Sequence, residues 1–401
     1  MTRIVLAYSG GLNTTLAVPW LRERYGAEVV AVAMDLGQGR ELDDIRERAL
    51  AIGCVRAHVL DLREEFARLH VLPALQAHAL YEHRYPMATA LGRPLMARHL
   101  VRVAEMEGAD AIAHGCTGKG NDQVRFEVSI RALRPGTTVL APAREWGLSR
   151  AEAIADARAR ALPVPAAAMG AYGTDTNLWG RSIQCGPLED PWHEPPEEVF
   201  VLTRPAGAAP DAPAYVDLRF ERGVPVAVND VTMPLLELIG SLETIAGTHG
   251  VGRLDLLENR VVGIKTREVY EAPAAVVLHA AHAELQAMVV DRDLERLAHQ
   301  LAVQYADLVY DGLWFTPRRE AIDAFVQSVQ ARVTGTVRVR LFKGQCTVVG
   351  RQSPHALYDH ALATYGEGDA FDHAAAAGFT AIHGLPAELA ARRAPRAGDL
   401  R

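Results

Sequence analysis

The sequence predicts an α/β protein in which a parallel sheet covered by helices is followed by a second, α+β part. Two observations carry this prediction. In residues 1–165, short apolar runs alternate with helical patterns, which is typical of a parallel sheet covered on both faces. After a proline-rich stretch, the pattern changes to hairpin-like strand pairs and helices in mixed order.

In the first part, strands are predicted from continuous apolar runs and helices from amphipathic spacing between them. The expected strands are residues 3–8, 28–34, 55–60, 110–113 and 138–141. The expected helices are residues 12–25, 41–52, 62–81 and 91–107. Elements in this order predict a doubly wound sheet, and such sheets bind ligands at the carboxyl edge of their strands.

Prolines between residues 162 and 213 break any long helix and predict an irregular connection that reaches over the first part. Beyond it, we expect hairpins at 215–220 with 224–228 and at 337–342 with 346–350, and helices at 235–246, 273–289, 294–310 and 320–333. The alanine- and arginine-rich end is expected to be a loosely held arm. The predicted domains are residues 1–165, 166–370 and 371–401.

Composition narrows the classes of function. The 401 residues include 42 Lys or Arg and 49 Asp or Glu, a net charge of −7, so the broad basic surface of a nucleic-acid-binding protein is not expected. The four cysteines are scattered, which argues against a zinc site, a disulfide framework or a dithiol redox centre. No apolar run approaches the length of a membrane span. We therefore expect a cytoplasmic protein that binds neither nucleic acid nor membrane.

The most informative segment joins the first strand to the first helix, and its sequence is Ala7-Tyr8-Ser9-Gly10-Gly11-Leu12-Asn13-Thr14-Thr15. Glycines allow the backbone to approach an anion, and free N–H groups at a helix start carry partial positive charge. An ordinary strand-to-helix turn with an N-cap serine is the alternative. The segment resembles the SGG-x-D-[ST] pyrophosphate loop of the N-type ATP pyrophosphatases, which split ATP between its α- and β-phosphates.

A second polar segment follows the strand expected at 110–113, and its sequence is His114-Gly115-Cys116-Thr117-Gly118-Lys119-Gly120-Asn121-Asp122-Gln123-Val124-Arg125-Phe126-Glu127. Its position after a strand places it at the carboxyl edge of the sheet. A flexible glycine-rich loop is the alternative, but this density of unlike polar groups favours ligand binding. A third, charged segment covers residues 247–273. Taken alone, its charged residues favour the interpretation that it is a solvent-exposed surface.

Taken together, the three segments resemble the argininosuccinate synthase family over about residues 3–358. Further matching stretches are Tyr81-Glu82-His83-Arg84-Tyr85, Thr89, Arg93-Pro94 and Leu188-Glu189-Asp190-Pro191. The stretch from Thr117 to Glu127 is highly specific by itself. Several such stretches in the same order identify the chain as a divergent member of this family.

The resemblance implies an ATP-dependent ligase with two steps. The ureido oxygen of citrulline attacks the α-phosphorus of ATP, which releases pyrophosphate and leaves a citrullyl-adenylate. The amine of L-aspartate then displaces AMP to give argininosuccinate. The implied cofactors are ATP and Mg²⁺, and the implied assembly is a homotetramer. Residues 1–165 would bind the nucleotide, residues 166–370 would serve catalysis and multimerisation, and residues 371–401 would be the arm.

The resemblance also implies roles for individual residues, with the metal ligands left unassigned. ATP would contact Ala7, Tyr8, Ser9, Gly10, Gly11, Leu12, Asn13, Thr14, Thr15, Met34 and Gly115. L-aspartate would contact Thr117, Asn121 and Asp122. Citrulline would contact Tyr85, Ala90, Asn121, Arg125, Gly173, Ser182, Glu258 and Tyr270, and Thr89 would be a further substrate-binding residue. The catalytic residues would be Asn13, Asp122 and Arg125.

The sequence departs from the family pattern at positions near the implied substrates. Asn13 replaces an aspartate, Thr15 a serine, Gln184 a glutamate and Ala143 a tryptophan, and Ala90 and Gly173 each replace a serine. A missing polar contact to a buried ligand group costs about 1–3 kcal/mol. The changes at 90, 173 and 184 would therefore weaken citrulline binding, whereas the aspartate-side residues all match.

Three hypotheses follow. The first is a working argininosuccinate synthase that tolerates these changes. The second is a relative that keeps ATP and aspartate but uses a different ureido or amide acceptor in a specialised pathway. The third is a catalytically silenced binding subunit, which is disfavoured because the aspartate-side residues are intact.

Overall fold

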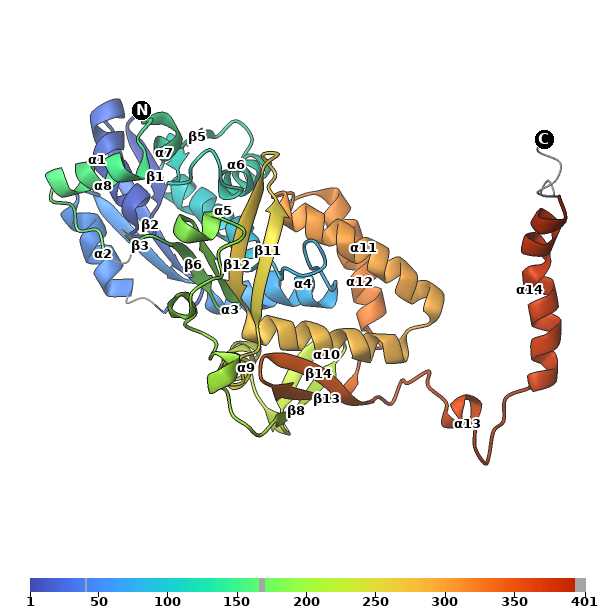
Figure 1. The fold of residues 1–401 in the computed structure, drawn as a ribbon. Coiled ribbons are helices and arrows are strands. Elements are labelled where there is room, and N and C mark those ends of the chain that lie inside the picture. Colours follow the sequence, from blue (N-terminus) through green and yellow to red (C-terminus); the bar gives the residue numbers. More distant parts are fainter. Residues whose placement is uncertain (40–41, 166–169, 394–401) are drawn as a thin grey trace, which may run out of the picture. The chain divides into compact units, whose positions relative to one another are not determined.

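A computed structural model describes residues 1–39, 42–165 and 170–393 (Figure 1). Residues 1–355 form one compact unit, and residues 356–401 form another. Within the described residues, no helix is both long enough and apolar enough to cross a membrane.

The first unit begins with a five-stranded parallel sheet whose strand order is β3-β2-β1-β4-β5. Its strands are β1 (Arg3–Ala7), β2 (Glu28–Asp35), β3 (Arg56–Asp61), β4 (Ala111–Ala113) and β5 (Thr138–Leu140). The adjacent strands β1 and β2 are buried along almost their whole length, as their continuous apolar runs predict. The predicted α/β class is confirmed.

Helices cover both faces of this sheet (Figure 1). On one face, α1 (Leu12–Tyr25) and α2 (Leu42–Ala51) pack against Ile4, Leu6 and Val29. On the other face, α5 (Ala88–Met106) packs against Val5 and Val30. The remaining helical segments of this region are α3 (Arg63–Phe66), the π-helical turn η1 (Ala67–Val71), α4 (Leu72–Gln76), α6 (Asp122–Leu133), α7 (Pro142–Glu145) and α8 (Arg150–Ala159).

A four-stranded antiparallel sheet with the order β11-β12-β7-β6 follows. It consists of β6 (Gly173–Asn177), β7 (Gly180–Gln184), β11 (Arg253–Asn259) and β12 (Lys265–Glu271). Along β11, exposed Asp255 and Leu257 alternate with buried Leu256 and Glu258. This period of two carries Glu258 to the same face as Tyr270 of the neighbouring strand, and both side chains are buried.

A second antiparallel sheet has the order β10-β9-β8-β13-β14. Its strands are β8 (Ala214–Glu221), β9 (Val224–Val228), β10 (Val231–Thr232), β13 (Gly335–Phe342) and β14 (Gln345–Gln352). The helices of this region are α9 (Leu235–Thr248), α10 (Pro273–Val289), α11 (Arg292–Tyr310) and α12 (Pro317–Gln330), and the 3-10 turns are η3 (Gly186–Glu189), η4 (Glu197–Val199) and η5 (Ala206–Ala208). One apolar core runs from the face of the parallel sheet under α5 to β8, β13 and α10.

The second unit contains α13 (His360–Ala363) and α14 (His373–Arg393). None of the residues of α14 is buried, and its exposed apolar side chains include Phe379, Ile382, Leu385 and Leu389. The end of the chain, which we expected to be a loose arm, is therefore helical over residues 373–393.

Several predicted elements were wrong in extent. The helix expected at 62–81 ends at Gln76, because the chain enters left-handed backbone at His78 (φ 51°). It is also interrupted by the π-helical turn η1. The helix expected at 91–107 begins earlier, at Ala88, directly after the left-handed Met87. The expected start of the second helix, Glu41, lies outside the described residues.

Other elements were missed altogether. The irregular connection expected at 162–213 contains the hairpin of β6 and β7, and the charged segment interpreted as a solvated face forms the hairpin of β11 and β12. These strands carry many polar residues, so neither an apolar run nor an alternation of apolar residues marks them. Helices α6, α7 and α8 were also not predicted.

Candidate functional site

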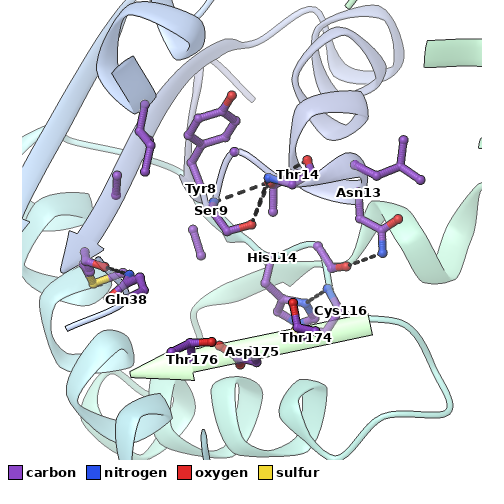
Figure 2. A pocket seen from close by; sticks show the side chains of 18 of the residues that line it. Tyr8, Ser9, Asn13, Thr14, Gln38, His114, Cys116, Thr174, Asp175 and Thr176 are labelled. Atoms are coloured by element: carbon purple, nitrogen blue, oxygen red, sulfur yellow. Dashed lines mark hydrogen bonds between the residues drawn. The ribbon is translucent and has the colours of Figure 1, made fainter. Parts of the chain in front are cut away.

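A pocket of about 680 Å³ opens at the carboxyl edge of the parallel sheet (Figure 2). Figure 2 shows Tyr8, Ser9, Asn13 and Thr14 on one side of it and β6 along the other. The predicted ATP residues that line it are Ala7, Tyr8, Ser9, Gly10, Gly11, Leu12, Asn13, Thr14, Met34 and Gly115. Thr15 does not line the pocket; it is fully buried in α1, with its hydroxyl 3.4 Å from that of Tyr8.

The turn before α1 exposes backbone to the pocket. Gly10 has φ 69°, a conformation that favours glycine, and Gly11 is the N-cap of α1. The first turn of α1 contains no acidic residue, so its positive end is not neutralised there. The Ser9 and Thr14 hydroxyl oxygens lie 3.2 Å apart (Figure 2). Amides and hydroxyls in this arrangement suit an anionic ligand such as a phosphate chain.

A cation completes this end of the pocket. Arg48 of α2 lines it, donates a hydrogen bond to the carbonyl of Gly10 at 3.4 Å, and pairs with Asp44 at 3.1 Å. Sequence reasoning did not identify Arg48, because no motif surrounds it and an arginine on an amphipathic helix is usually a surface residue.

Gly115 and Asn13 hold two segments of the pocket wall together. A Cβ atom at Gly115 would lie 2.7 Å from Thr14 Cγ2, so only glycine allows this close approach. Asn13 donates from Nδ2 to the Gly115 carbonyl at 3.2 Å (Figure 2). This bond turns the Asn13 carbonyl oxygen away from Gly115, which leaves an oxygen acceptor beside the turn.

An alternating row of charges leads from the pocket into the interior. Arg93 of α5 lines the pocket and binds Asp175 and, at 2.8 Å, Asp122; Asp122 in turn binds Arg125 at 2.9 Å. Burial alone would raise the pKa of Asp122, but the two guanidinium groups hold it well below its usual range. Within the described residues, Arg93 Nε and Arg125 Nη2 are buried without a hydrogen-bond partner, so each keeps an unused donor.

A buried carboxylate lies at the inner end of the row. Glu258 accepts hydrogen bonds from the hydroxyls of Tyr270 and, at 2.7 Å, Tyr310. Tyr85 stacks on Tyr270 with 4.0 Å between ring centroids. Burial raises the pKa of Glu258, while the two hydroxyl donors and the positive charge of Arg125 oppose this rise.

Asn121 connects this carboxylate to the second polar segment. It is the N-cap of α6, it donates from Nδ2 to the Tyr310 hydroxyl at 2.9 Å, and it accepts from the backbone N–H of Val261 at 2.9 Å. The tip between β11 and β12 is thereby attached to the glycine-rich segment. The structure thus brings together Asn121, Asp122, Arg125, Glu258 and Tyr270, which all belong to the predicted substrate set.

The remaining predicted substrate residues lie around this cluster or apart from it. Tyr85 and Thr89 have hydroxyls 3.0 Å apart, and Ala90 is fully buried in α5. Ser182 is the cross-strand neighbour of Tyr270, whereas Thr117 is exposed on the glycine-rich segment.

Gly173 lines the pocket at the carboxyl edge of the parallel sheet rather than the buried cluster. A Cβ there would make ordinary contact with Gln184 at 3.4 Å, so the position has room for a serine. The Gln184 side chain accepts a hydrogen bond from Arg260 at 2.9 Å, and Gln184 is the cross-strand neighbour of Gly173.

Sequence reasoning missed Tyr310 and gave no role to Arg93 or Asp175. Arg93 and Asp175 stand in or beside stretches that match the family, so the resemblance could have found them. Tyr310 ends an amphipathic helix, where an aromatic residue normally indicates packing, and nothing in its neighbourhood indicates a polar role. No group of three or more His, Cys, Asp or Glu side chains in the described ranges could hold a metal ion.

A five-stranded parallel sheet with a glycine turn, a helix N-terminus and a polar pocket at its carboxyl edge defines the α/β nucleotide-binding proteins. Two family models extend this finding: one described as "Arginosuccinate synthase N-terminal HUP domain" matches residues 3–163, and one described as "Arginosuccinate synthase C-terminal domain" matches residues 172–390. The chain therefore belongs to the argininosuccinate synthase family.

Relatives agree along nearly the whole chain. The chain is 54% identical to the argininosuccinate synthase of Gloeobacter violaceus over 97% of this chain and 98% of the relative. It is 55% identical to that of Symbiobacterium thermophilum over 96% and 97%, and 52% identical to that of Dehalococcoides mccartyi over 98% and 97%.

Proposed function

We propose that the protein is an ATP-dependent ligase that condenses citrulline with L-aspartate to give argininosuccinate, AMP and pyrophosphate in arginine biosynthesis. The observation that carries this proposal is the charge row Asp175–Arg93–Asp122–Arg125, which joins a phosphate-suited pocket to a buried polar cluster. A ligase of this kind needs both, because the nucleotide and two amino acids must react within one site.

The first step forms a bond between the citrulline ureido oxygen and the α-phosphorus of ATP and breaks the bond from that phosphorus to the bridging oxygen, so pyrophosphate leaves. In the second step the aspartate amine attacks the ureido carbon, the carbon–oxygen bond to AMP breaks, and the amine loses a proton. Both steps develop negative charge on phosphate oxygens. The α1 N-terminus and Arg48 stabilise this charge, and no covalent protein nucleophile is required.

The proposed substrate contacts follow the matched positions. The turn from Ala7 to Thr14, together with Met34 and Gly115, holds ATP. Asn121 and Asp122, with Thr117, hold aspartate, and Asn121 also contacts citrulline. Arg125, Glu258 and Tyr270 hold citrulline, with Tyr85, Thr89, Ala90 and Ser182 around it and Gly173 on the side of the nucleotide. A guanidinium and a carboxylate are the groups that would recognise the carboxylate and ammonium of an amino acid.

Mg²⁺ fits this pocket as an ion carried by the phosphates of ATP. Such ions keep several waters and use one or two protein oxygens, so they do not need a cage of carboxylates. Asn13 would supply a carbonyl oxygen, and Asp44 and Asp175 line the pocket, although each is already paired with an arginine. Bound there, Mg²⁺ would neutralise charge on the departing pyrophosphate.

A different ureido or amide acceptor is the second candidate. The observation that favours it is the absence of a hydroxyl at two positions, since Ala90 is fully buried and Gly173 leaves room that a serine side chain could occupy. An acceptor with fewer polar groups, or with more bulk near residue 173, would lose less binding affinity from these changes.

We also propose a homotetramer, a cytoplasmic location and the domain division at about residues 165 and 370. The apolar side chains along α14 support an assembly, because exposed apolar side chains of this kind mark protein–protein contacts. Size-exclusion chromatography with light scattering of the full chain and of a chain ending at residue 355 tests the assembly.

The experiment for the function is pyrophosphate release from purified protein with MgATP, aspartate and citrulline, each omitted in turn. Release that requires citrulline, with argininosuccinate detected by mass, supports the first proposal. Absence of release with citrulline, together with calorimetric binding of ATP and aspartate, would overturn it and favour another acceptor. If the protein does not bind ATP, the remaining hypothesis is the catalytically silenced binding subunit.

A further inference from the structure

Tyr310 places one hydroxyl between the aspartate-side and acceptor-side residues of the cluster. It is the last residue of α11 and is 1% exposed. Its oxygen accepts a hydrogen bond from Asn121 Nδ2 at 2.9 Å, and its proton goes to Glu258 Oε2 at 2.7 Å. A phenol hydroxyl has one proton to donate and an oxygen that can accept. Here the oxygen accepts from the Asn121 amide, and the single proton is donated to the Glu258 carboxylate.

The side chain is held tightly in this position. Tyr81 stacks on its ring with 3.4 Å between centroids, and the Arg125 guanidinium carbon lies 4.7 Å from the ring centroid. Arg125 Nε also donates to the Tyr310 carbonyl at 2.9 Å. At Gly312 (φ 78°), a Cβ would lie 2.7 Å from Arg125 Cα, so glycine allows the end of α11 to approach α6.

Tyr270 offers an informative contrast. Its hydroxyl donates to the other oxygen of the same carboxylate, Glu258 Oε1, and within the described residues its side chain makes no other hydrogen bond. Tyr270 therefore acts on Glu258 alone, whereas Tyr310 acts on both Glu258 and Asn121.

We propose that Tyr310 is a positioning residue that couples the two amino-acid subsites by orienting Asn121 and Glu258 through one shared hydroxyl. The inference rests on the proposed function, since the roles of Asn121 and Glu258 come from it. Coupling of this kind means that removing one hydroxyl weakens the binding of both amino acids, whereas removing the Tyr270 hydroxyl weakens one.

The ionisation of Glu258 provides a second readout. The ionisable groups that interact with Glu258 are Tyr270 and Glu268 of β12, Tyr310 of α11, Arg125 of α6, Arg260 of the tip between β11 and β12, and Tyr81, Glu82 and Tyr85 of the segment before α5. Burial and the adjacent carboxylate raise the pKa of Tyr310, so its hydroxyl keeps its proton at neutral pH. Loss of this donor destabilises the ionised form of Glu258 and raises its pKa.

The test compares Tyr310→Phe, Tyr270→Phe and Tyr305→Phe by steady-state kinetics with citrulline and aspartate varied separately. Tyr305 is the matched control, because it is buried in the same helix and stacks edge-on with Trp314. We expect Tyr310→Phe to raise both KM values about 10-fold, with kcat changed less. Tyr270→Phe should raise the citrulline KM alone, and Tyr305→Phe should change neither.

The pH profile separates positioning from packing. In Tyr310→Phe the acidic limb of kcat/KM for citrulline should move about one pH unit upward. Replacing Tyr310 by 3-fluorotyrosine keeps the hydroxyl and makes it a stronger donor, so that limb should move downward and both KM values should stay near those of wild type. This second variant keeps the test decisive if the phenylalanine variant folds poorly.

The inference is overturned if Tyr310→Phe changes only one KM, if both variants leave the acidic limb in place, or if Tyr305→Phe gives the same changes. If the wild-type protein shows no turnover with citrulline, the proposed function fails separately. The same variants are then compared by calorimetric affinity for aspartate and citrulline, where a coupled loss of affinity supports the inference and an uncoupled loss contradicts it.

Discussion

The two ends of the site are built in different ways. The end proposed to bind phosphate, here called the phosphate end, is mainly backbone from one continuous segment, with glycines and the start of α1 exposing N–H groups to an open pocket. The end proposed to bind citrulline, here called the acceptor end, is made of side chains from α6, β11, β12 and α11, which bind one another in a buried cluster. A backbone site depends on chain conformation, whereas a side-chain site depends on segments that meet only after folding. The two ends should therefore respond differently to the same kind of change.

The largest expected effect comes from Asp122→Asn. Asp122 is half-buried and pairs with the largely buried Arg93 and Arg125, and removing one charge from such a pair costs up to about 3–5 kcal/mol. We expect kcat/KM for aspartate to fall on the order of 1000-fold, with the KM for ATP changed little. Asp217→Asn is the control, because Asp217 pairs with Arg338 between β8 and β13, away from the site. An equal rise in the KM for ATP would show that the two ends are not separable.

Acid should weaken the acceptor end through buried histidines. His78 begins the segment that carries Tyr81 and Tyr85, its ring lies 5.3 Å from that of His279, and burial lowers the pKa of His78 and of His282 to about 4. Because the unfolded value is near 6.5, each imidazole contributes stability above pH 6.5 that is lost as the pH falls toward 4.

His282→Gln tests this acid sensitivity. At pH 5.0, the wild-type imidazole should have lost about 2 kcal/mol of its contribution to unfolding free energy relative to pH 7.5. Between pH 7.5 and pH 5.0, the free energy of unfolding of the variant should therefore fall about 2 kcal/mol less than that of the wild type. Urea unfolding at both pH values measures this difference. Exposed His355→Gln is the control and should behave as wild type. Identical pH dependence in wild type and His282→Gln would contradict the prediction.

Gly115→Ala should damage the phosphate end selectively. The new methyl group would lie 2.7 Å from Thr14 Cγ2 and 3.2 Å from the Thr14 backbone nitrogen, so the turn must move. We expect the KM for ATP to rise about 10-fold while the citrulline KM stays within about twofold. Gly240→Ala, at a helical position with no neighbour within 4 Å, should alter neither value. A change confined to citrulline would reverse the assignment of the two ends.

The smallest expected effect concerns Asn13. Asn13→Asp supplies a carboxylate oxygen, which hard cations prefer, but it loses the hydrogen bond from Nδ2 to Gly115. We expect the Mg²⁺ concentration at half-maximal rate to fall about threefold, a modest gain because the two effects oppose each other. Asn13→Ala, which has neither oxygen nor donor, should raise it. Unchanged Mg²⁺ dependence in both variants would show that residue 13 does not face the ion.

The same contrast explains what could be predicted from the sequence. The boundaries of α1 and the strands of the parallel sheet are local consequences of apolar runs and of the Gly10-Gly11 turn, so they were predictable. The strands β6, β7, β11 and β12 were not, because Asp175, Arg181 and Glu268 interrupt any apolar pattern. Their polar side chains are satisfied by partners far away in the sequence, such as Arg93 for Asp175.

The candidate site divides similarly. The residues of the glycine turn and Gly115 could be predicted as a phosphate-suited surface from physical chemistry alone. Glu258 and Tyr270 were predictable only from the family resemblance, since in isolation they belong to a charged surface segment. Neither physical chemistry nor the family resemblance could identify Tyr310, because its role arises from the end of α11 approaching Arg125 and Asn121.

The cross-strand row Asp175, Ser182, Tyr270 and Leu254 has a consequence for how the gene can change in length. Deleting one codon in β7 or β12 would shift the pairing by one residue and exchange the faces of every side chain beyond it, so Ser182 or Tyr270 would leave the site. Insertions and deletions tolerated during evolution should therefore avoid residues 173–184 and 253–271. They should accumulate instead in the short 3-10 turns between residues 186 and 213, where no sheet register has to be kept.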